Sequence, residues 1–427
     1  MGRNKRVSLL AAVILLPAML FAQFNNNTTS PYSRFGLGDL QQGAFGRSSA
    51  MAGAILGSRN NQHINLANPA SYTSVDSLAF LFEFGFTSKF AGYKNDISSL
   101  STNDVNFNYF AFSFPVANWL GIGMGLTPFS DSGYELRLDE EEENFGLVRH
   151  HYYGEGSLSR ANIGIGLQPF KNISVGANLY YFFGSLTRNA DLSFLEVADL
   201  YSVQKYELIR LRDFGFNYGV QATLPFKGNK QVTIGFTLEN KPEFTAFHSD
   251  LTRKILGYGT SSSDIDTVKY INEEKALIKM PLYYGVGISY ASNEKLEINA
   301  DYIHQAWSEA SFFGESNPFL TNLDRFAIGM ELVPNKYSIR SYFEKIAYRA
   351  GFKVENSYLM LNAQQITDIG ISFGVGLPVY RSLSLINLSA EFGKRGKTEY
   401  NLVREYYAKL SLSINLYDLW FIKRKYD

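Results

Sequence analysis

Residues 79–86 read Ala-Phe-Leu-Phe-Glu-Phe-Gly-Phe, and residues 120–127 read Leu-Gly-Ile-Gly-Met-Gly-Leu-Thr. In both stretches, large apolar side chains alternate with small or polar ones. A period of two places the apolar side chains on one face of an extended strand. Small and polar residues then share the other face, which suits a strand with lipid on one side and a filled interior on the other.

The same alternation recurs along the rest of the chain and predicts an all-β protein with 14 strands in total. The further strands are expected at 104–116, 163–168, 172–187, 214–224, 232–238, 284–290, 296–302, 326–332, 346–354, 369–377, 386–392 and 410–416.

The links between these strands alternate in length. Short turns are expected near 117–118, 170–171, 227–229, 292–294, 334–336 and 380–382. Longer polar links are expected at 91–102, 129–156, 188–210, 241–278, 306–321, 355–364 and 394–403. This alternation is typical of an antiparallel transmembrane barrel with periplasmic turns and extracellular loops. Trp119, Trp307 and Trp420 are expected in the aromatic girdles of such a barrel.

Composition and charge agree with a barrel and argue against other classes. Aromatic residues make up 15% of the chain, which has 36 glycines, no cysteine and a formal net charge of zero. A neutral chain argues against a nucleic-acid partner. Without cysteine, the protein forms no disulfide, uses no thiolate chemistry and is not a lipoprotein.

The chain begins like an exported protein. Arg3, Lys5 and Arg6 precede an apolar run at 7–21, which is short for a spanning helix. We therefore predict a signal peptide at 1–22, cleaved after about Ala22, and export to the bacterial outer membrane. Residues 23–76 are predicted to be an N-terminal hatch that plugs the lumen of a barrel formed by 77–427, although such a segment also suits a periplasmic tail.

Three stretches resemble the FadL-type family of outer-membrane transport proteins for hydrophobic compounds, in its Bacteroidota branch. They are Ala50-Met51-Ala52-Gly53-Ala54 with Asn68-Pro69-Ala70, then 325–332 with 348–352, and 366–370 with 373–378. The resemblance implies a 14-stranded barrel, a hatch that includes Asn68, Pro69 and Ala70, and a lateral opening to the membrane. Some relatives, such as the PorV shuttle, serve protein export instead.

Charged residues on the inward face are the first candidate site. Strand parity places Glu297, Asp301, Glu331, Lys345, Arg349, Lys353, Glu391 and Lys409 in the lumen. These residues suit a polar path or gate, but polar lumens are the rule in such barrels, which favours the structural satisfaction of a water-filled or plugged interior.

Aromatic residues suggest a second site. Alternation changes face within 103–116, so the strand needs a bulge there. The hypothesis is an apolar ligand patch facing the lumen; the alternative is aromatic packing against the hatch. The patch would comprise Phe110, Phe112, Phe114, Tyr180, Phe182 and Tyr283. A possible lateral opening is predicted at Gly121, Gly123, Gly125 and Pro128, because proline cannot donate to a strand ladder.

Catalytic and metal-binding patterns are weak. Asp301, His304 and Ser308 are near one another in sequence, but alternation points Asp301 inward and His304 outward. The acidic run 139–143 suits a solvated loop tip, or a contact with divalent cations or lipopolysaccharide. His150 and His151 alone do not make a metal site. We predict no enzyme activity and no cofactor.

The sequence thus favours an outer-membrane channel for uptake of small hydrophobic or amphipathic, fatty-acid-like compounds through a hatch-gated barrel. The alternative is a non-transporting barrel subunit or shuttle of a secretion or outer-membrane assembly machine. Expected partners are outer-membrane lipid and lipopolysaccharide, a small hydrophobic ligand and, for the alternative, other envelope proteins.

Overall fold

The computed structural model describes residues 27–41, 43–96, 98–197, 199–240, 243–256, 265–380 and 382–420. The predicted signal peptide lies outside these residues. Within them, no helix has the length and apolar character needed to cross a membrane.

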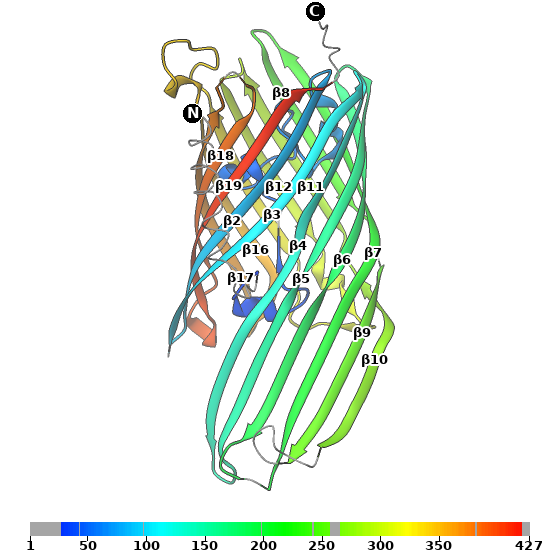
Figure 1. Cartoon of the computed structure of the whole chain (residues 1–427), viewed down its shortest axis with the longest axis vertical. Coiled ribbons are helices and arrows are strands. Elements are labelled where there is room, and N and C mark those ends of the chain that lie inside the picture. The colour runs from blue at the N-terminus through cyan, green and yellow to red at the C-terminus, as the bar shows by residue number, and fades with distance from the viewer. Residues whose placement is uncertain are drawn as a thin grey trace, which may run out of the picture.

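Within the described residues, the predicted closed barrel of 14 antiparallel strands is confirmed (Figure 1). The last strand pairs with the first over its whole length, from Leu419 opposite Ala79 to Arg404 opposite Lys94. The barrel strands are β2 (Ala79–Lys94), β3 (Ser99–Ala117), β4 (Leu120–Glu142), β5 (Gly146–Phe170), β6 (Ile173–Phe194), β7 (Tyr201–Phe226), β8 (Lys230–Glu239), β11 (Tyr283–Ser292), β12 (Leu296–Gln305), β15 (Leu323–Leu332), β16 (Ala347–Leu361), β17 (Gln364–Pro378), β18 (Leu385–Arg395) and β19 (Arg404–Leu419).

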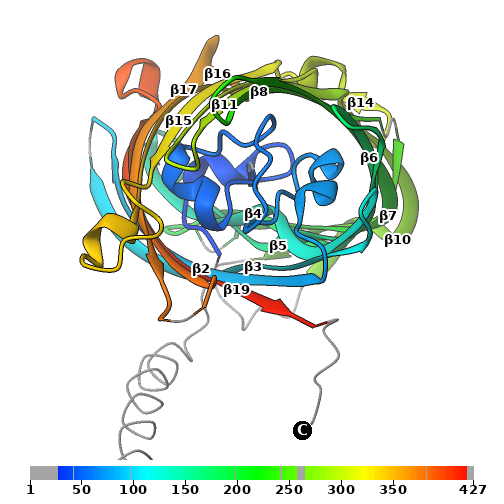
Figure 2. The same ribbon diagram turned by 90° about the horizontal axis from the view of Figure 1, so that it is seen from above.

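Further short elements lie inside the barrel or at its ends. Those of the N-terminal segment are η1 (Pro31–Arg34), β1 (Asp39–Leu40), η2 (Gly46–Met51) and η3 (Pro69–Ser74). The others are η4 (Trp307–Glu309), β13 (Ser311–Phe312), β14 (Glu315–Ser316), η5 (Phe343–Lys345) and η6 (Glu399–Asn401). Figure 2 shows the N-terminal segment, in blue, lying within the ring of strands.

One side of the barrel extends far beyond the other. Strands β4, β5, β6 and β7 have 23, 25, 22 and 26 residues, whereas a transmembrane strand needs only about 9–11. An added hairpin, β9 (Glu243–Leu256) and β10 (Ile265–Lys279), continues this sheet because β9 pairs with the N-terminal half of β7. We call the part of β4–β7, β9 and β10 that lies beyond the rim the projecting sheet; its tips are at the bottom of Figure 1.

The projecting sheet corrects several predicted loops. The links expected at 129–156, 188–210 and 241–278 are mostly paired strand. Strands outside the membrane have polar residues on both faces, so their alternation is weak. Conversely, the turn expected at 334–336 is a longer link that contains η5.

The outward face carries the apolar side chains that alternation predicted. Phe214, Phe216 and Tyr218 on β7 are 46–50% exposed and face away from the lumen. Trp119 and Trp420 are also exposed, as expected for girdle residues. The prediction for Trp307 is wrong: it is 1% exposed, and its ring packs against Tyr358 with centroids 4.8 Å apart.

Candidate functional site

The Asn68-Pro69-Ala70 motif lies inside the barrel and fixes a turn of the hatch. Asn68 precedes η3, and its side-chain oxygen accepts a hydrogen bond from Ala70 N, which caps the turn. Its Nδ2 donates to Leu56 O at 3.0 Å. Asn68 and Ala70 are fully buried. The motif therefore ties two parts of the hatch together.

Inward-facing glycines provide the groove that receives this turn. An added Cβ at Gly121 or Gly123 would collide with Tyr72, and one at Gly219 would collide with Asn68. Tyr72 OH donates to Asn178 Oδ1 on β6 at 2.9 Å. Glycine on these strands thus allows the hatch backbone to approach the barrel wall closely.

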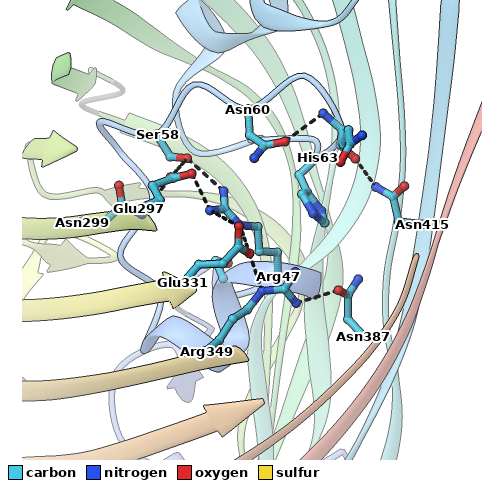
Figure 3. Close-up of polar contacts among 12 residues, drawn as sticks. Arg47, Ser58, Asn60, His63, Glu297, Asn299, Glu331, Arg349, Asn387 and Asn415 are labelled. Atoms are coloured by element: carbon cyan, nitrogen blue, oxygen red, sulfur yellow. Dashed lines mark hydrogen bonds and ion pairs between the residues drawn. The ribbon is translucent and has the colours of Figure 1, made fainter. Parts of the chain in front are cut away.

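The middle of the hatch is held by a buried network of charged side chains (Figure 3). Strand parity predicted the members of this network that belong to the barrel, but not the one that belongs to the hatch. Arg47 donates through Nη2 to Glu297 Oε2 at 2.5 Å and through Nε to Glu331 Oε2 at 2.8 Å. Arg349 Nε donates to the same Glu331 oxygen at 2.6 Å. Burial opposes a charge on Arg47, but the two carboxylates outweigh it and raise the pKa of Arg47.

Arg47 itself was missed from the sequence. Its signal is modest: it is the only charged residue in the Gly-, Ala- and Ser-rich stretch 43–57. A lone arginine in a small-residue segment that faces a wall of predicted inward carboxylates is the pattern that would have found it.

Asp301 makes a different contact with the hatch. Its Oδ2 accepts hydrogen bonds from the backbone amides of Ile55 at 2.6 Å and Leu56 at 2.9 Å. His304 instead lies 2.8 Å from Asp324 Oδ1 through its Nδ1, and Ser308 Oγ donates to Asn322. The three residues considered for catalysis therefore engage separate partners.

Three more of the predicted lumen charges, Lys353, Glu391 and Lys409, form a second cluster nearer the loop end of the barrel. Lys353 Nζ lies 2.8 Å from Glu391 Oε1 and 3.3 Å from Asp368 Oδ2. Lys409 and these three residues line one cavity of about 170 Å³. Lys345 lies apart, in η5 at the turn end. The lumen charges are thus brought together in two groups, one bonded to the hatch and one around a small polar chamber.

Barrel pairing is incomplete beside this chamber. Strands β3 and β4 pair only from Ala117 opposite Leu120 to Phe110 opposite Leu126. Beyond that point, β3 continues along β2 and β4 continues along β5. We call the resulting opening, between 99–109 of β3 and 127–142 of β4, the seam.

The seam changes the predicted lateral opening. Gly121, Gly123 and Gly125 lie in the paired part of β4, and the absence of their side chains leaves room for the hatch. The opening begins after them, and Pro128 lines the polar chamber at its edge. A bulge between Pro128 and Ser130 marks the change.

Residues 27–41 of the hatch fill the part of the seam that adjoins the paired region of β3 and β4, and we call them the seam segment. Strand β1 pairs with β4, with Asp39 opposite Asp131 and Leu40 opposite Ser130. On the other side, Thr29 Oγ1 donates to Thr102 Oγ1 of β3 at 2.6 Å. Arg395 Nη1 donates to Asp39 Oδ1 at 2.8 Å. Although burial opposes ionisation, Arg395 lowers the pKa of Asp39.

The predicted aromatic patch is divided by the barrel wall. Phe110, Phe112 and Phe114 face outward; Phe112 stacks on Phe82 with centroids 4.8 Å apart. The expected bulge lies between Gly85 and Phe86 on the β2–β3 pair, and it keeps Phe107 and Phe110 on the same outward face. The prediction that these three rings line the lumen is therefore wrong, because the shift aligns them with the phenylalanines of β2.

Tyr180, Phe182 and Tyr283 do face inward, but little space surrounds them. Phe182 packs against Phe129 and Phe244 with ring centroids 5.0 and 4.8 Å away. Tyr180 and Tyr283 line a cavity of about 60 Å³. A packed apolar cluster joins Tyr32 and Leu37 of the hatch to barrel residues that include Leu158, Leu186, Phe244, Trp307 and Tyr358.

The tip of the β4–β5 hairpin carries the acidic run. Arg149 donates to both carboxylate oxygens of Asp139, at 2.7 and 2.9 Å, and His151 lies 3.0 Å from Glu135. Across the described ranges, no group of three or more His, Asp or Glu side chains is placed to hold a metal ion.

Comparisons with known proteins agree with this architecture. Solved structures of similar fold include the Pseudomonas putida toluene transporter TodX (14% identity, TM-score 0.59, covering 88% of this chain and 99% of TodX). The Ralstonia pickettii toluene transporter TbuX has 13% identity and a TM-score of 0.57, with 88% and 99% covered. A Pseudomonas aeruginosa FadL homologue has 11% identity and a TM-score of 0.54, with 90% and 99% covered. At these identities the likeness concerns the fold.

A search of curated proteins finds no match. The family model described as BamG matches residues 4–427. That match spans the hatch, the barrel and the projecting sheet together, and the chain therefore belongs to the BamG family.

Proposed function

We propose that this protein is a non-transporting barrel subunit that binds other envelope proteins in a secretion or assembly machine of the outer membrane. The observation that carries the proposal is the filled lumen. The hatch is bonded to the wall through Arg47 and Asp301, and Tyr32 and Leu37 of the hatch belong to a packed apolar cluster with barrel residues. A transport path for an apolar compound needs apolar space beside the hatch, whereas the two larger cavities there are lined by many polar and charged groups.

The sizes and linings of the cavities support this reading. The cavity of about 60 Å³ beside Tyr180 is also lined by Arg160 and Glu239. The polar chamber of about 170 Å³ is lined by Lys89, Lys353, Glu391 and other charged groups. A larger cavity of about 880 Å³, on the turn side of the hatch, is lined by His63, Glu297, Arg349 and many other polar groups. An apolar compound placed there would separate charges from their partners without replacing the lost contacts, which is costly.

The projecting sheet supplies surface for partners. Because its strands are about twice the length needed to cross a bilayer, roughly half of each lies outside the hydrocarbon region. Such a structured extension is longer than passage across the bilayer requires, and it suits contact with a protein.

The test is purification of the native full-length protein in mild detergent, followed by mass spectrometry of bound proteins and bound lipids. We expect stoichiometric protein partners. A clean barrel without them, carrying a small apolar ligand, would overturn the proposal.

A second candidate is a channel for small hydrophobic or amphipathic compounds, with the hatch as its gate. The seam favours it, because the gap in barrel pairing beside Pro128 would become a lateral route from the chamber to the membrane if the seam segment moved out of it. Three neighbours of similar fold are described as toluene transporters or a FadL homologue. Cells lacking this protein should then take up toluene or a fluorescent fatty acid more slowly, and the cloned chain should restore the rate.

A further inference from the structure

The seam-facing edge of β4 already accepts a strand of this chain. Strand β1 lies antiparallel to it, and Gln41 N donates to Phe129 O at 2.9 Å. Farther along, Ser33 Oγ lies 3.0 Å from both Gly133 N and Gly133 O. The seam segment therefore satisfies the backbone of this edge as far as Gly133.

The contacts of Gly133 reveal which backbone groups face the seam. In an antiparallel strand, both backbone groups of a residue point to the same side, and the side alternates along the chain. The pairing of β4 with β5 is regular from Ser130 to Glu142. The amide and carbonyl groups of Glu135, Arg137 and Asp139 therefore point to the seam, as those of Gly133 do.

The edge continues past the seam segment. Among the described residues, no strand pairs with 134–142 on the seam side, while β5 pairs with all of them on the other. This stretch belongs to the projecting sheet, so a strand can approach it without displacing the hatch. An exposed strand edge is a template for pairing with another chain.

The side chains of this edge define what would fit. Leu136 is opposite Tyr152, whose ring lies under Arg34 of the hatch, so Leu136 and Leu138 share the inward face. Leu138 is 50% exposed. Glu135 and Arg137 lie on the opposite face, and the exposed carboxylates of Glu140–Glu142 end the strand.

We infer that residues 134–142 of β4 bind an extended segment of a partner protein by antiparallel strand addition. The inference rests on the proposed function and names the kind of partner that it requires. Backbone hydrogen bonds supply affinity in this mode, and alternate side chains supply specificity. The segment alternates apolar and polar residues, with its apolar face beside Leu136 and Leu138. Because it runs antiparallel, its N-terminal end meets the acidic tip and is basic.

The test uses a labelled synthetic peptide that alternates valine and threonine and begins with three lysines. Its control has the same residues with the lysines at the C-terminal end. Binding of each to the purified full-length protein in detergent is measured by fluorescence anisotropy. We expect the first peptide to bind more tightly, because only that peptide places its lysines beside Glu140–Glu142.

Two variants separate backbone pairing from side-chain attraction. Arg137→Pro removes an amide that points to the seam and keeps the β4–β5 ladder, since proline is tolerated at a strand edge. Arg137→Thr removes the same charge and keeps the amide. We expect Arg137→Pro to weaken peptide binding about tenfold, the equivalent of one to two backbone hydrogen bonds, and Arg137→Thr to leave it nearly unchanged. Unchanged tryptophan emission shows that both variants are folded.

Three results would overturn the inference: no peptide binding, equal binding of both peptides, or equal weakening by the two variants. Self-association of the protein that Arg137→Pro abolishes would assign the edge to a second copy instead. If protein partners co-purify equally with Arg137→Pro and with the wild type, strand addition fails while the proposed function stands. If no partner co-purifies with the wild type, both fail.

Discussion

Arg47 and Glu331 lie 284 residues apart in the sequence and 2.8 Å apart in the barrel interior. Arg47 also contacts Glu297, and Glu331 also contacts Arg349, so two cations and two carboxylates form one buried unit. Buried ions require such mutual contacts, because each loses its hydration when the hatch enters the lumen.

Replacing Arg47 should therefore destabilise the folded protein strongly. Arg47→Met leaves Glu297 buried without its guanidinium and Glu331 with only Arg349, and we expect a loss of about 3–5 kcal/mol. Urea unfolding followed by tryptophan emission measures it. Arg34→Met is the control, since Arg34 makes cation–π contacts with Tyr152 and, at longer range, Phe35, each worth about 0.5–1 kcal/mol at a partly exposed site. Equal losses for the two variants would contradict a central role for the Arg47 unit.

The glycine groove should tolerate no added methyl group. In Gly123→Ala, the new Cβ would overlap the ring of Tyr72, so the hatch turn should no longer seat fully. We expect faster protease cleavage within 43–76. Gly92→Ala is the matched control, because the nearest atom to its Cβ would be Tyr406 O at 4.0 Å. A Gly123→Ala hatch as resistant as the wild type would show that the turn can shift without loss.

The tryptophans should differ in their access to solvent. Trp307 is 1% exposed, whereas Trp119 is 57% exposed. Trp307→Phe should therefore remove the fluorescence component that acrylamide quenches least. Trp119→Phe should leave that component in place. Trp307→Ala should also cost about 3–5 kcal/mol through the cavity that it leaves. Strong quenching of Trp307 in the wild type would place it at the surface.

A disulfide across the seam would distinguish the two candidate functions. Leu40 and Ser130 are direct partners in antiparallel register, at a spacing that accommodates a disulfide, and the chain has no cysteine of its own. Leu40→Cys/Ser130→Cys should therefore crosslink on oxidation. For a partner-binding subunit, co-purified proteins should be unchanged. Loss of toluene uptake on oxidation, restored by reduction, would favour the channel.

Sequence periodicity predicted the barrel because lipid imposes a strict rule on each spanning strand. Phe214, Phe216 and Phe236 must face outward, and the residues between them must not, so parity along a strand is readable. Outside the bilayer that rule ends. Strand β10 has solvent near both faces, and its exposed residues include Lys269, Glu273 and Lys275. The sequence of the β9–β10 hairpin therefore predicted a loop.

The interior was harder to predict for a different reason. Strand parity identified Glu297, Asp301 and Glu331 as inward, but their partners Arg47, Ile55 and Leu56 belong to a segment without periodicity. Phe110 was assigned to the wrong face because a single bulge reverses every later side chain. Its position depends on alignment with Phe84 across the β2–β3 pair, which local sequence does not reveal.

The contacts of Arg47 also constrain the order of biogenesis. The hatch precedes every barrel strand in the chain, yet the carboxylates that hold it belong to β12 and β15, and η2 of the hatch also contacts β18 and β19, which come last. Contacts between such distant parts of a chain form slowly. Until the strands close, the hatch lacks the charges that retain it, so its docking is coupled to the completion of the ring. In effect, a seated hatch reports that the whole barrel has been assembled.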